Sequence, residues 1–354
     1  MKRIDQKLFL LDVLAIPPFL SCLAVWIGWA LPWAWGQESF ITNQETTPKI
    51  WTVALDGTGQ FTSIQEAIDF ANSGDTIFIN PGRYEEDVTV HSKDGLKVLG
   101  AGVEQVLIAG LNRVGTLHIG KWPYGATNVE ISGMSIQEHG GLGVGIFNGG
   151  GILLKNLRVD GLVFGQQVQD VRIENCVVGK SETTGLAFAD SQAVLIGNVV
   201  HDNDHGVSVG GNSIVRLERN IIKRSLFEAV LVTDKGRATL VQNTLVNNGG
   251  GVKFQDDSQG TVTANIIDES RVGIAWSSGN ALKIEHNGLH NNQVNYQVGD
   301  SPIIAAEKPQ GFNDVYVPPL FIAPEQGDYR LQANSPLQSI ANFAFLGALP
   351  PVKD

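Results

Sequence analysis

The densest group of titratable side chains in this sequence lies in one short turn, His201-Asp-Asn-Asp-His205. A histidine and a carboxylate within hydrogen-bond reach of each other can act as a general acid/base pair. When the chain is aligned on its internal repeat, His205 falls beside Glu228, and Asp204 and Lys253 lie nearby. If the protein is an enzyme, we expect these four side chains to form its catalytic group. The alternative is a solvated pair on an exposed turn.

A second set of side chains could contact a ligand. It comprises two aromatic residues in the irregular segment 121–126, one outward serine and three turn aspartates: Trp122, Tyr124, Ser208, Asp190, Asp234 and Asp256. Aspartate at a turn commonly accepts hydrogen bonds from backbone N–H groups, which is the structural alternative for the last three. Ca²⁺ needs several oxygen ligands converging at about 2.3–2.6 Å. Carboxylates two coils apart are separated by roughly 9–10 Å, so we expect no metal and no cofactor.

These residues sit on a repeat that extends from Gly185 to about Val298. Each unit opens with Gly or Ala, followed by an apolar, an outward and a second large apolar residue, and the openings are 21, 23, 22 and 22 residues apart. Asparagines recur with the same period, at Asn175, Asn198, Asn220, Asn243, Asn265 and Asn287. A period near 22 with three short β-like runs per unit is typical of a solenoid. We therefore predict an all-β, right-handed parallel β-helix.

The recurring asparagine is expected at a tight turn. Asparagine tolerates the left-handed backbone region, and its amide can bond to the equivalent residue of the next coil. The outward residues of the strand that each Gly opens are mostly small or apolar: Ala187, Ser208, Leu231, Lys253 and Ala275. Carbohydrate-cleaving sites are usually richer in carboxylates. This face therefore argues against strong catalysis.

An amphipathic helix precedes the repeat. Residues 62–66 have the spacing of a helix capping box, and Ile64, Ala67, Ile68 and Ala71 then fall on one helical face. A helix at this place is expected to cover the open apolar end of the first coil and so to block edge-to-edge aggregation.

The segments 53–68, 82–86 and 99–102 resemble the opening of pectin methylesterases and of bacterial parallel β-helix repeat proteins of the pectin-lyase fold. Segments 317–321, 328–331 and 335–337 resemble the closing part of the broader group. The resemblance implies the fold and a carbohydrate substrate class. The esterase catalytic segments, of the types QAVAL, QDTL, DFIFG and GRPW, have no counterpart here; Gln169-Asp170 lacks the Thr-Leu that should follow. The resemblance therefore does not supply a mechanism.

The composition limits the classes of partner that the protein is expected to bind. The 354 residues include 41 Gly, only 17% are charged, and the net charge is −11. No Lys/Arg cluster occurs beyond the first seven residues, which excludes nucleic acid as an expected partner. Of the two cysteines, Cys22 lies in the N-terminal apolar run, and Cys176 is interpreted as a small apolar filler.

The N-terminus predicts export. Lys2, Arg3 and Lys7 precede an apolar run from Leu8 to Trp35, which is either a signal peptide or a retained membrane anchor. The expected organisation is an export segment at 1–36, a linker at 37–49, the β-helix at 50–340 and a C-terminal tail at 341–354. Localisation is expected to be extracytoplasmic, with membrane contact only through the first segment.

Three functions remain open from the sequence. The first is an exported protein that binds, and as a lyase or hydrolase processes, a cell-wall or extracellular polysaccharide along its lateral face. The second is a non-catalytic periplasmic or surface scaffold or adhesion protein. The third is a carbohydrate esterase, which the missing motifs disfavour.

Overall fold

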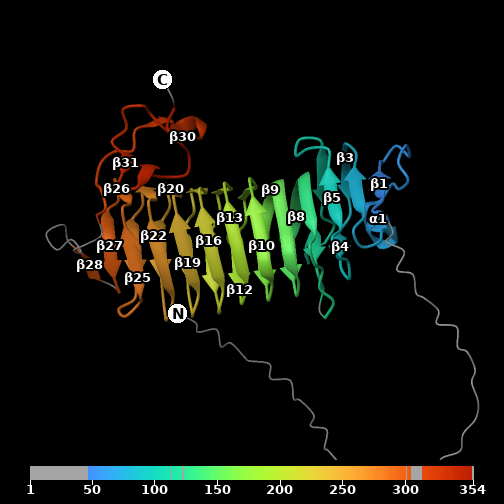
Figure 1. Ribbon diagram of the computed structural model, residues 1–354, viewed down its shortest axis with the longest axis horizontal. Coiled ribbons are helices and arrows are strands. Elements are labelled where there is room, and N and C mark those ends of the chain that lie inside the picture. The colour runs from blue at the N-terminus through green and yellow to red at the C-terminus, as the bar shows by residue number, and fades with distance from the viewer. Residues whose placement is uncertain (1–46, 113, 122, 300, 304–312, 353–354) are drawn as a thin grey trace, which may run out of the picture. The chain divides into compact units, whose positions relative to one another are not determined.

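The computed structural model describes residues 47–112, 114–121, 123–299, 301–303 and 313–352. The expected export segment and most of the expected linker lie outside these residues. The described chain is a parallel β-solenoid of about 11 turns with almost no helix, which confirms the predicted fold class. Its coils stack in a row (Figure 1). No helix within the described residues is long and apolar enough to cross a membrane.

Each coil contributes to three parallel sheets, named here the first, second and third faces. The first face contains β1 (Ile50–Val53), β2 (Thr76–Ile79), β5 (Lys97–Gly100), β10 (Gln169–Glu174), β13 (Gln192–Ile196), β16 (Ile214–Glu218), β19 (Arg237–Val241), β22 (Gln259–Thr263) and β25 (Leu282–Glu285). The second contains β3 (Gly82–Glu85), β6 (Val106–Ala109), β11 (Val177–Gly179), β14 (Val199–His201), β17 (Ile221–Lys223), β20 (Thr244–Val246), β23 (Ile266–Asp268) and β26 (Gly288–His290). The third contains β4 (Val88–Val90), β7 (Leu117–Ile119), β12 (Thr184–Ala189), β15 (His205–Gly210), β18 (Glu228–Val232), β21 (Gly250–Phe254), β24 (Val272–Trp276) and β27 (Val294–Val298).

Two long strands connect the irregular early coils to the regular later ones. β8 (Glu130–Phe147) and β9 (Gly150–Gln166) each run through all three faces and pair with each other. β8 also pairs with β5 to β7, and β9 pairs with β10 to β12. Valine, isoleucine and leucine alternate inward along the strands and form one core that fills the whole solenoid.

The asparagine ladder is present for five of the six predicted residues. Asn198, Asn220, Asn243, Asn265 and Asn287 are at most 1% exposed. Each side-chain amide donates to Oδ1 of the next asparagine along the ladder at 2.9–3.0 Å, from Asn198 to Asn287. Each Oδ1 from Asn220 onward also accepts a backbone N–H of the preceding rung. The ladder therefore satisfies polar groups that would be costly to bury unpaired.

Two details of the predicted ladder were wrong. Asn175 is exposed, and Cys176 occupies the ladder position instead, donating its N–H to Oδ1 of Asn198 at 2.9 Å. The left-handed backbone lies one residue before each buried asparagine, for example at Gln242 and Ala264, with φ 53° and 58°. The turn residue must point outward to turn the chain, while the ladder amide must point inward to reach its partners.

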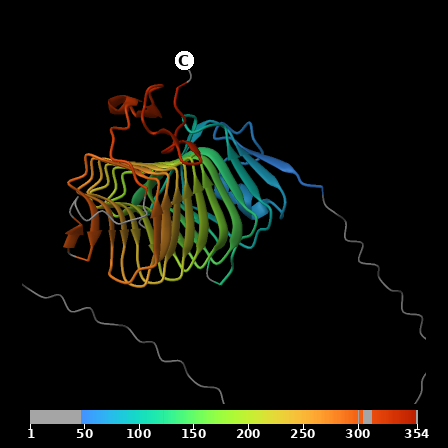
Figure 2. The ribbon, with the colours of Figure 1, turned by 60° about the vertical axis from the view of Figure 1, so that its left-hand side comes forward.

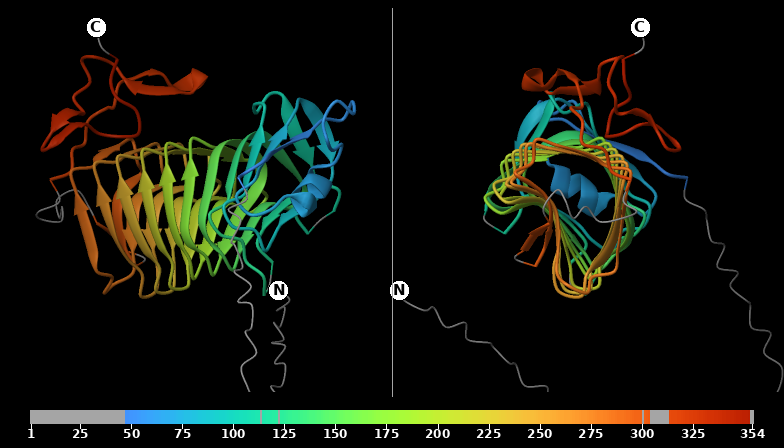
Figure 3. Two further views of the ribbon diagram at one scale, coloured as in Figure 1. Left: turned by 45° about the vertical axis from the view of Figure 1, so that its right-hand side comes forward. Right: turned by 90° about the vertical axis from the view of Figure 1, so that its left-hand side faces the viewer.

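The predicted helix is α1 (Ile64–Phe70), and it lies across the N-terminal end of the coils (Figure 3). Ser63 is its N-cap and accepts from the N–H of Glu66 at 3.3 Å. Glu86, from the segment that resembles the esterases, accepts from the N–H groups of Ile64 and Gln65 at 2.8 and 3.0 Å. A carboxylate is well placed against the partial positive charge of a helix N-terminus, so Glu86 fastens the end cap.

The row of parallel coils ends at β27, which pairs with the antiparallel strand β28 (Ser301–Ile303). The described residues from 313 onward fold back over the second face (Figure 2). This C-terminal part contains β29 (Phe321–Ala323), the 3-10 helix η2 (Pro324–Gln326), β30 (Asp328–Leu331), β31 (Gln338–Ile340) and β32 (Phe343–Phe345). A second apolar core joins it to Ile221, Val246 and Ile266. Leu346 and Ala348, in the expected tail, are buried in that core.

Candidate functional site

The third face carries an outward column of side chains that is longer than the repeat predicted. Strand register continues the predicted column toward the N-terminus, so that it reads Thr89, His118, Gly145, Phe164, Ala187, Ser208, Leu231, Lys253, Ala275 and Gln297. Neighbouring members are about 4.8 Å apart. From Ala187 onward the outward residues of this face are mostly small or apolar, as predicted. The early coils carry aromatic residues in the same column.

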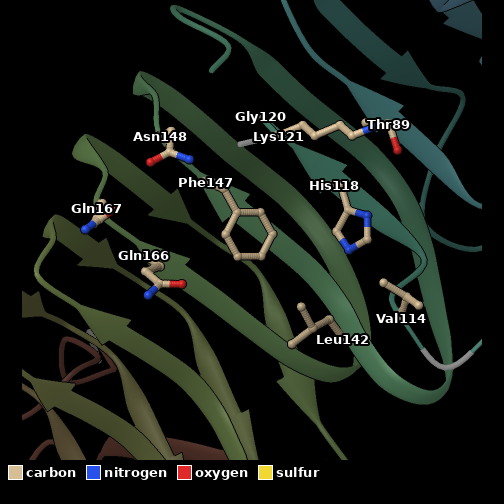
Figure 4. Close-up of a pocket in the computed structure, with 10 residues that line it drawn as sticks. All are labelled: Thr89, Val114, His118, Gly120, Lys121, Leu142, Phe147, Asn148, Gln166 and Gln167. Carbon is tan, nitrogen blue, oxygen red and sulfur yellow. The ribbon is translucent and has the colours of Figure 1, made fainter. Parts of the chain in front are cut away.

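A cleft of about 580 Å³ lies over these early coils. Its walls combine apolar, aromatic, amide and basic side chains (Figure 4): Thr89, Val114, His118, Gly120, Lys121, Leu142, Phe147, Asn148, Gln166 and Gln167. The rings of His118 and Phe147 lie in the middle of the view, with Lys121, Asn148 and Gln167 along one side and Leu142 and Val114 along the other. A concave, mostly apolar surface with a few polar groups is the usual form of a ligand site.

Two aromatic rings, those of His118 and Phe147, line this cleft, and the ring of Phe164 packs beside them. The rings of His118 and Phe147 are 5.9 Å apart, and those of Phe147 and Phe164 are 6.1 Å apart in an edge-to-face arrangement. Gly145 makes room for these rings, because a Cβ at this position would lie 2.5 Å from Phe147 and 2.9 Å from His118. The cleft therefore depends on a glycine between two rings.

The environment of His118 favours its neutral form. Burial lowers the pKa of the His118 imidazole, and this effect outweighs a hydrogen bond to the backbone of Val114 and the charge of Asp87. A neutral imidazole has one donor and one acceptor nitrogen. His118 can thus contribute a hydrogen bond and an aromatic surface to a ligand without contributing a charge.

Sequence reasoning missed this cleft, although a signal was present. Gly143-Val-Gly-Ile146 follows the same pattern of small, apolar, outward and apolar residues that opens the later units. Strand register places Val144 beside Val163, and Val163 beside Leu186. The early coils lack the asparagine marker, so they were not aligned with the rest.

The predicted acid/base group is brought together on the later coils of the third face. Nδ1 of His205 lies 3.2 Å from Oε2 of Glu228, and Nζ of Lys253 lies 3.4 Å from Oε1 of the same carboxylate. The contact with His205, opposed by burial and reinforced by the charge of Lys253, lowers the pKa of Glu228 to about 2. Glu228 is therefore ionised near neutral pH and cannot act as a proton donor there. Its carboxylate instead orients the side chains of His205 and Lys253.

The turn cluster has an aromatic neighbour. The ring of Phe227 lies 5.2 Å from that of His205, and the backbone carbonyl of Asp204 accepts from the N–H of Phe227 at 2.8 Å. Ser208 is half-buried in the outward column. Neither His205 nor Glu228 lines the cleft described above.

The three turn aspartates hold neighbouring backbone. Asp190 accepts from the N–H of Asn212 at 2.9 Å, and Asp234 accepts from the N–H of Gly211 at 2.9 Å. Asp256 accepts from the N–H of Asp234 at 3.1 Å. Each of the three aspartates has φ between 50° and 55°, the left-handed conformation of a tight turn. Their carboxylates are therefore engaged in turn formation.

The aromatic pair predicted to stack on a ligand is only partly described. Trp122 lies outside the described residues. Tyr124 is 63% exposed, and its carbonyl accepts from the N–H of Lys121 at 2.6 Å. This turn presents Lys121 to the cleft wall, whereas Tyr124 is not among the lining residues.

Outside these sites, an exposed ion pair bridges two coils. Arg224 donates to both carboxylate oxygens of Asp202 at 2.7 Å.

Within the described ranges, no three His, Cys, Asp or Glu side chains converge as a metal site would require. Burial raises the pKa of the Cys176 thiol to about 12, which agrees with its interpretation as an apolar filler.

Comparison with known proteins adds a family and a fold. Residues 114–306 match the family model described as "Periplasmic copper-binding protein (NosD)". Among solved structures, the chain is similar to the pectate lyase Pel9A, with 13% identity, a TM-score of 0.53, and 86% of this chain and 96% of that chain covered. It is also similar to an alginate lyase from Paenibacillus sp. str. FPU-7, with 12% identity, a TM-score of 0.51, and 72% and 99% covered. At these identities the structures show the fold alone. Comparison with curated proteins gave no match.

Proposed function

Because the chain belongs to the NosD family of periplasmic β-helix proteins, we propose that it is an extracytoplasmic protein that binds a polysaccharide in the cleft around Phe147. The observation that carries this proposal is the combination of two aromatic rings in the cleft, those of His118 and Phe147, with amide side chains along the wall. Aromatic faces pack against the apolar faces of sugar rings, and amides can both donate to and accept from hydroxyl groups.

Two further points support a glycan. The cleft opens on a sheet whose strands repeat every 4.8 Å or so, which suits a linear polymer lying across successive coils. The two lyases with the same fold are named for polysaccharides, pectate and alginate. The absence of the esterase segments argues against methyl-ester hydrolysis, so binding is the activity that we propose.

The copper site that the family description implies does not fit the described residues. Copper in proteins is held by imidazole, thiolate or thioether ligands that converge on the ion. Cys176 and Met134 are buried in the core, at 2% and 0% exposure, and in the described part of the chain no three His, Cys, Asp or Glu side chains converge. No step of the proposed function therefore involves copper.

The test uses the chain from residue 37 onward and a panel of acidic and neutral polysaccharides. Retarded migration of the wild-type protein through a gel that contains one of them is the expected result, and Phe147→Ala should migrate as fast as it does in a gel without polysaccharide. Phe227→Ala, which removes an exposed ring beside the turn cluster, is the matched control and should leave the retardation unchanged. Wild-type protein that migrates freely through every gel would overturn the proposal.

A second candidate function is catalysis by the turn cluster. It is favoured by the contacts of Glu228 with His205 and Lys253, because a carboxylate that orients a histidine is a recurring catalytic arrangement. In this reading His205 is the acid/base residue and Glu228 positions it. Release of reducing ends, unsaturated ends or methanol from the same panel would be measured. Turnover that persists in His205→Ala would remove this assignment.

A further inference from the structure

We propose that the glycan bound in the cleft carries carboxylate groups, and that Lys121 is the cation that recognises them. This inference rests on the proposed function, and it adds the chemical class of the ligand. It follows from comparing the cleft with the equivalent turn positions of later coils.

One turn position changes its chemistry along the third face. Extending the strand register by one or two residues aligns Lys121, Asn148 and Gln167 with Asp190, Gly211, Asp234 and Asp256. Asn148 and Gln167 have φ of 49° and 52°, as the aspartates do, whereas the left-handed residue on the coil of Lys121 is its neighbour Gly120, with φ 82°. The turn therefore carries aspartate on three later coils, but two amides at the same corner, and a lysine next to it, where it borders the cleft.

This change does not follow from the turn itself. Aspartate is well suited to a left-handed corner, and glutamine is a less usual choice there. Carboxylates are also good acceptors for the hydroxyl groups of neutral sugars. A site for a neutral glycan would therefore have no reason to exclude aspartate, whereas a site for an anionic glycan would.

The rest of the cleft has the same character. None of its lining residues is acidic, in a chain with 36 Asp and Glu and a net charge of −11. The carboxylate of Asp87, whose charge reaches His118, accepts from the N–H of Leu111 at 2.9 Å and is thus engaged in its own turn. Lys121 is exposed at the rim, where it can pair with a ligand carboxylate, and the amides can donate to the same group.

The experiment compares two ligands that differ only in charge. An oligouronate and the same oligosaccharide with its carboxyl groups methyl-esterified are titrated calorimetrically into the full chain. We expect the acidic form to bind at least tenfold more tightly, with a preference that falls as salt is raised, because salt screens exposed charges. A sulfated glycan of similar length distinguishes a carboxylate site from a general anion site, and binding equal to that of the oligouronate would overturn the carboxylate assignment.

Two variants locate the effect. Lys121→Met should abolish most of the preference, while Lys235→Met, an exposed lysine beside the turn of a later coil, should retain it. Gln167→Asp places at the cleft the residue that the next coil carries at the same corner, and it should weaken acidic binding with little effect on the ester. Equal or tighter binding of the ester by wild-type protein would overturn this inference and leave the proposed function standing. Failure of both forms and of every neutral glycan would overturn both.

Discussion

The early and later coils of the third face have the same stacked parallel strands, but their outward side chains differ. Around Phe147 the strands β8 and β9 run continuously through three faces, and a glycine between two rings leaves a cleft. From Asn198 onward each coil is divided by turns, and the buried asparagines link the coils one to the next. We therefore expect the later coils to contribute most to stability through the ladder, and the proposed binding surface to lie on the early coils.

The largest expected effect is on the ladder half. Asn243→Ala removes an amide that donates to Asn265 and Leu217 and an oxygen that accepts from Asn220. Leaving such buried groups unpaired should lower the free energy of unfolding by about 3 kcal/mol, measured by urea denaturation. Asn175→Gly is the control, because Asn175 is exposed and glycine accepts its left-handed backbone. Equal losses in both variants would contradict the role of the ladder.

The second effect concerns pH and the turn cluster. The pKa of Glu228 is lowered to about 2 in the folded protein, from an ordinary value of 4.5. Its contribution is therefore fully present above pH 4.5 and is lost as the pH falls toward 2. We expect Glu228→Gln to be less stable than wild type at pH 7 by about 2 kcal/mol, with the two converging near pH 2. Melting temperatures of both proteins, recorded between pH 2 and pH 7, test this prediction. A difference that does not change with pH would show that the charge of Glu228 is not responsible.

The third effect is confined to the cleft. Gly145→Val should place a side chain between His118 and Phe147 and weaken glycan binding at least tenfold, roughly 1.4 kcal/mol. Ser208→Val introduces the same side chain in the same outward column, three coils farther along, and should bind as wild type does. Calorimetric titration of both variants separates the two halves of the face. A similar loss in the serine variant would extend the binding surface beyond the cleft.

The smallest effect is expected at the exposed ion pair. Arg224→Met removes a bidentate ion pair with Asp202, but both side chains are well exposed, at 46% and 43%. Exposed pairs are worth about 0.5 kcal/mol, so the melting temperature should hardly change. A loss of stability as large as that of Asn243→Ala would show that this ion pair is one of the main contributions to the stability of the later coils.

The sequence predicted the later coils better than the early ones because the later coils carry two markers with one period. The asparagines and the small residues that open each strand identified the fold, the outward column and the proximity of His205 to Glu228. The ladder position of Cys176 was hidden, because an exposed asparagine stands one residue before it. Two serine–asparagine pairs, Ser225 with Asn248 and Ser270 with Asn292, were also missed; in each, the serine N–H donates to Oδ1 of the asparagine one coil farther along.

The cleft was harder to predict for a physical reason. Its residues come from four successive coils with irregular spacing, and two of those coils lack turns that would mark their boundaries. The packing of the C-terminal segment on Ile221 and Ile266 was equally hidden, since alternation within a strand does not reveal what covers its outward side.

The most direct test of where a glycan binds is hydrogen exchange by mass spectrometry on the full chain, with and without the polysaccharide that retards it best. If the ligand binds in the cleft, exchange should be slower on binding in segments 114–121 and 142–148, which line it. Exchange around His205 and Lys253 should be unchanged. Protection confined to segments 201–209 and 228–254 would contradict binding in the cleft and place the ligand on the turn cluster.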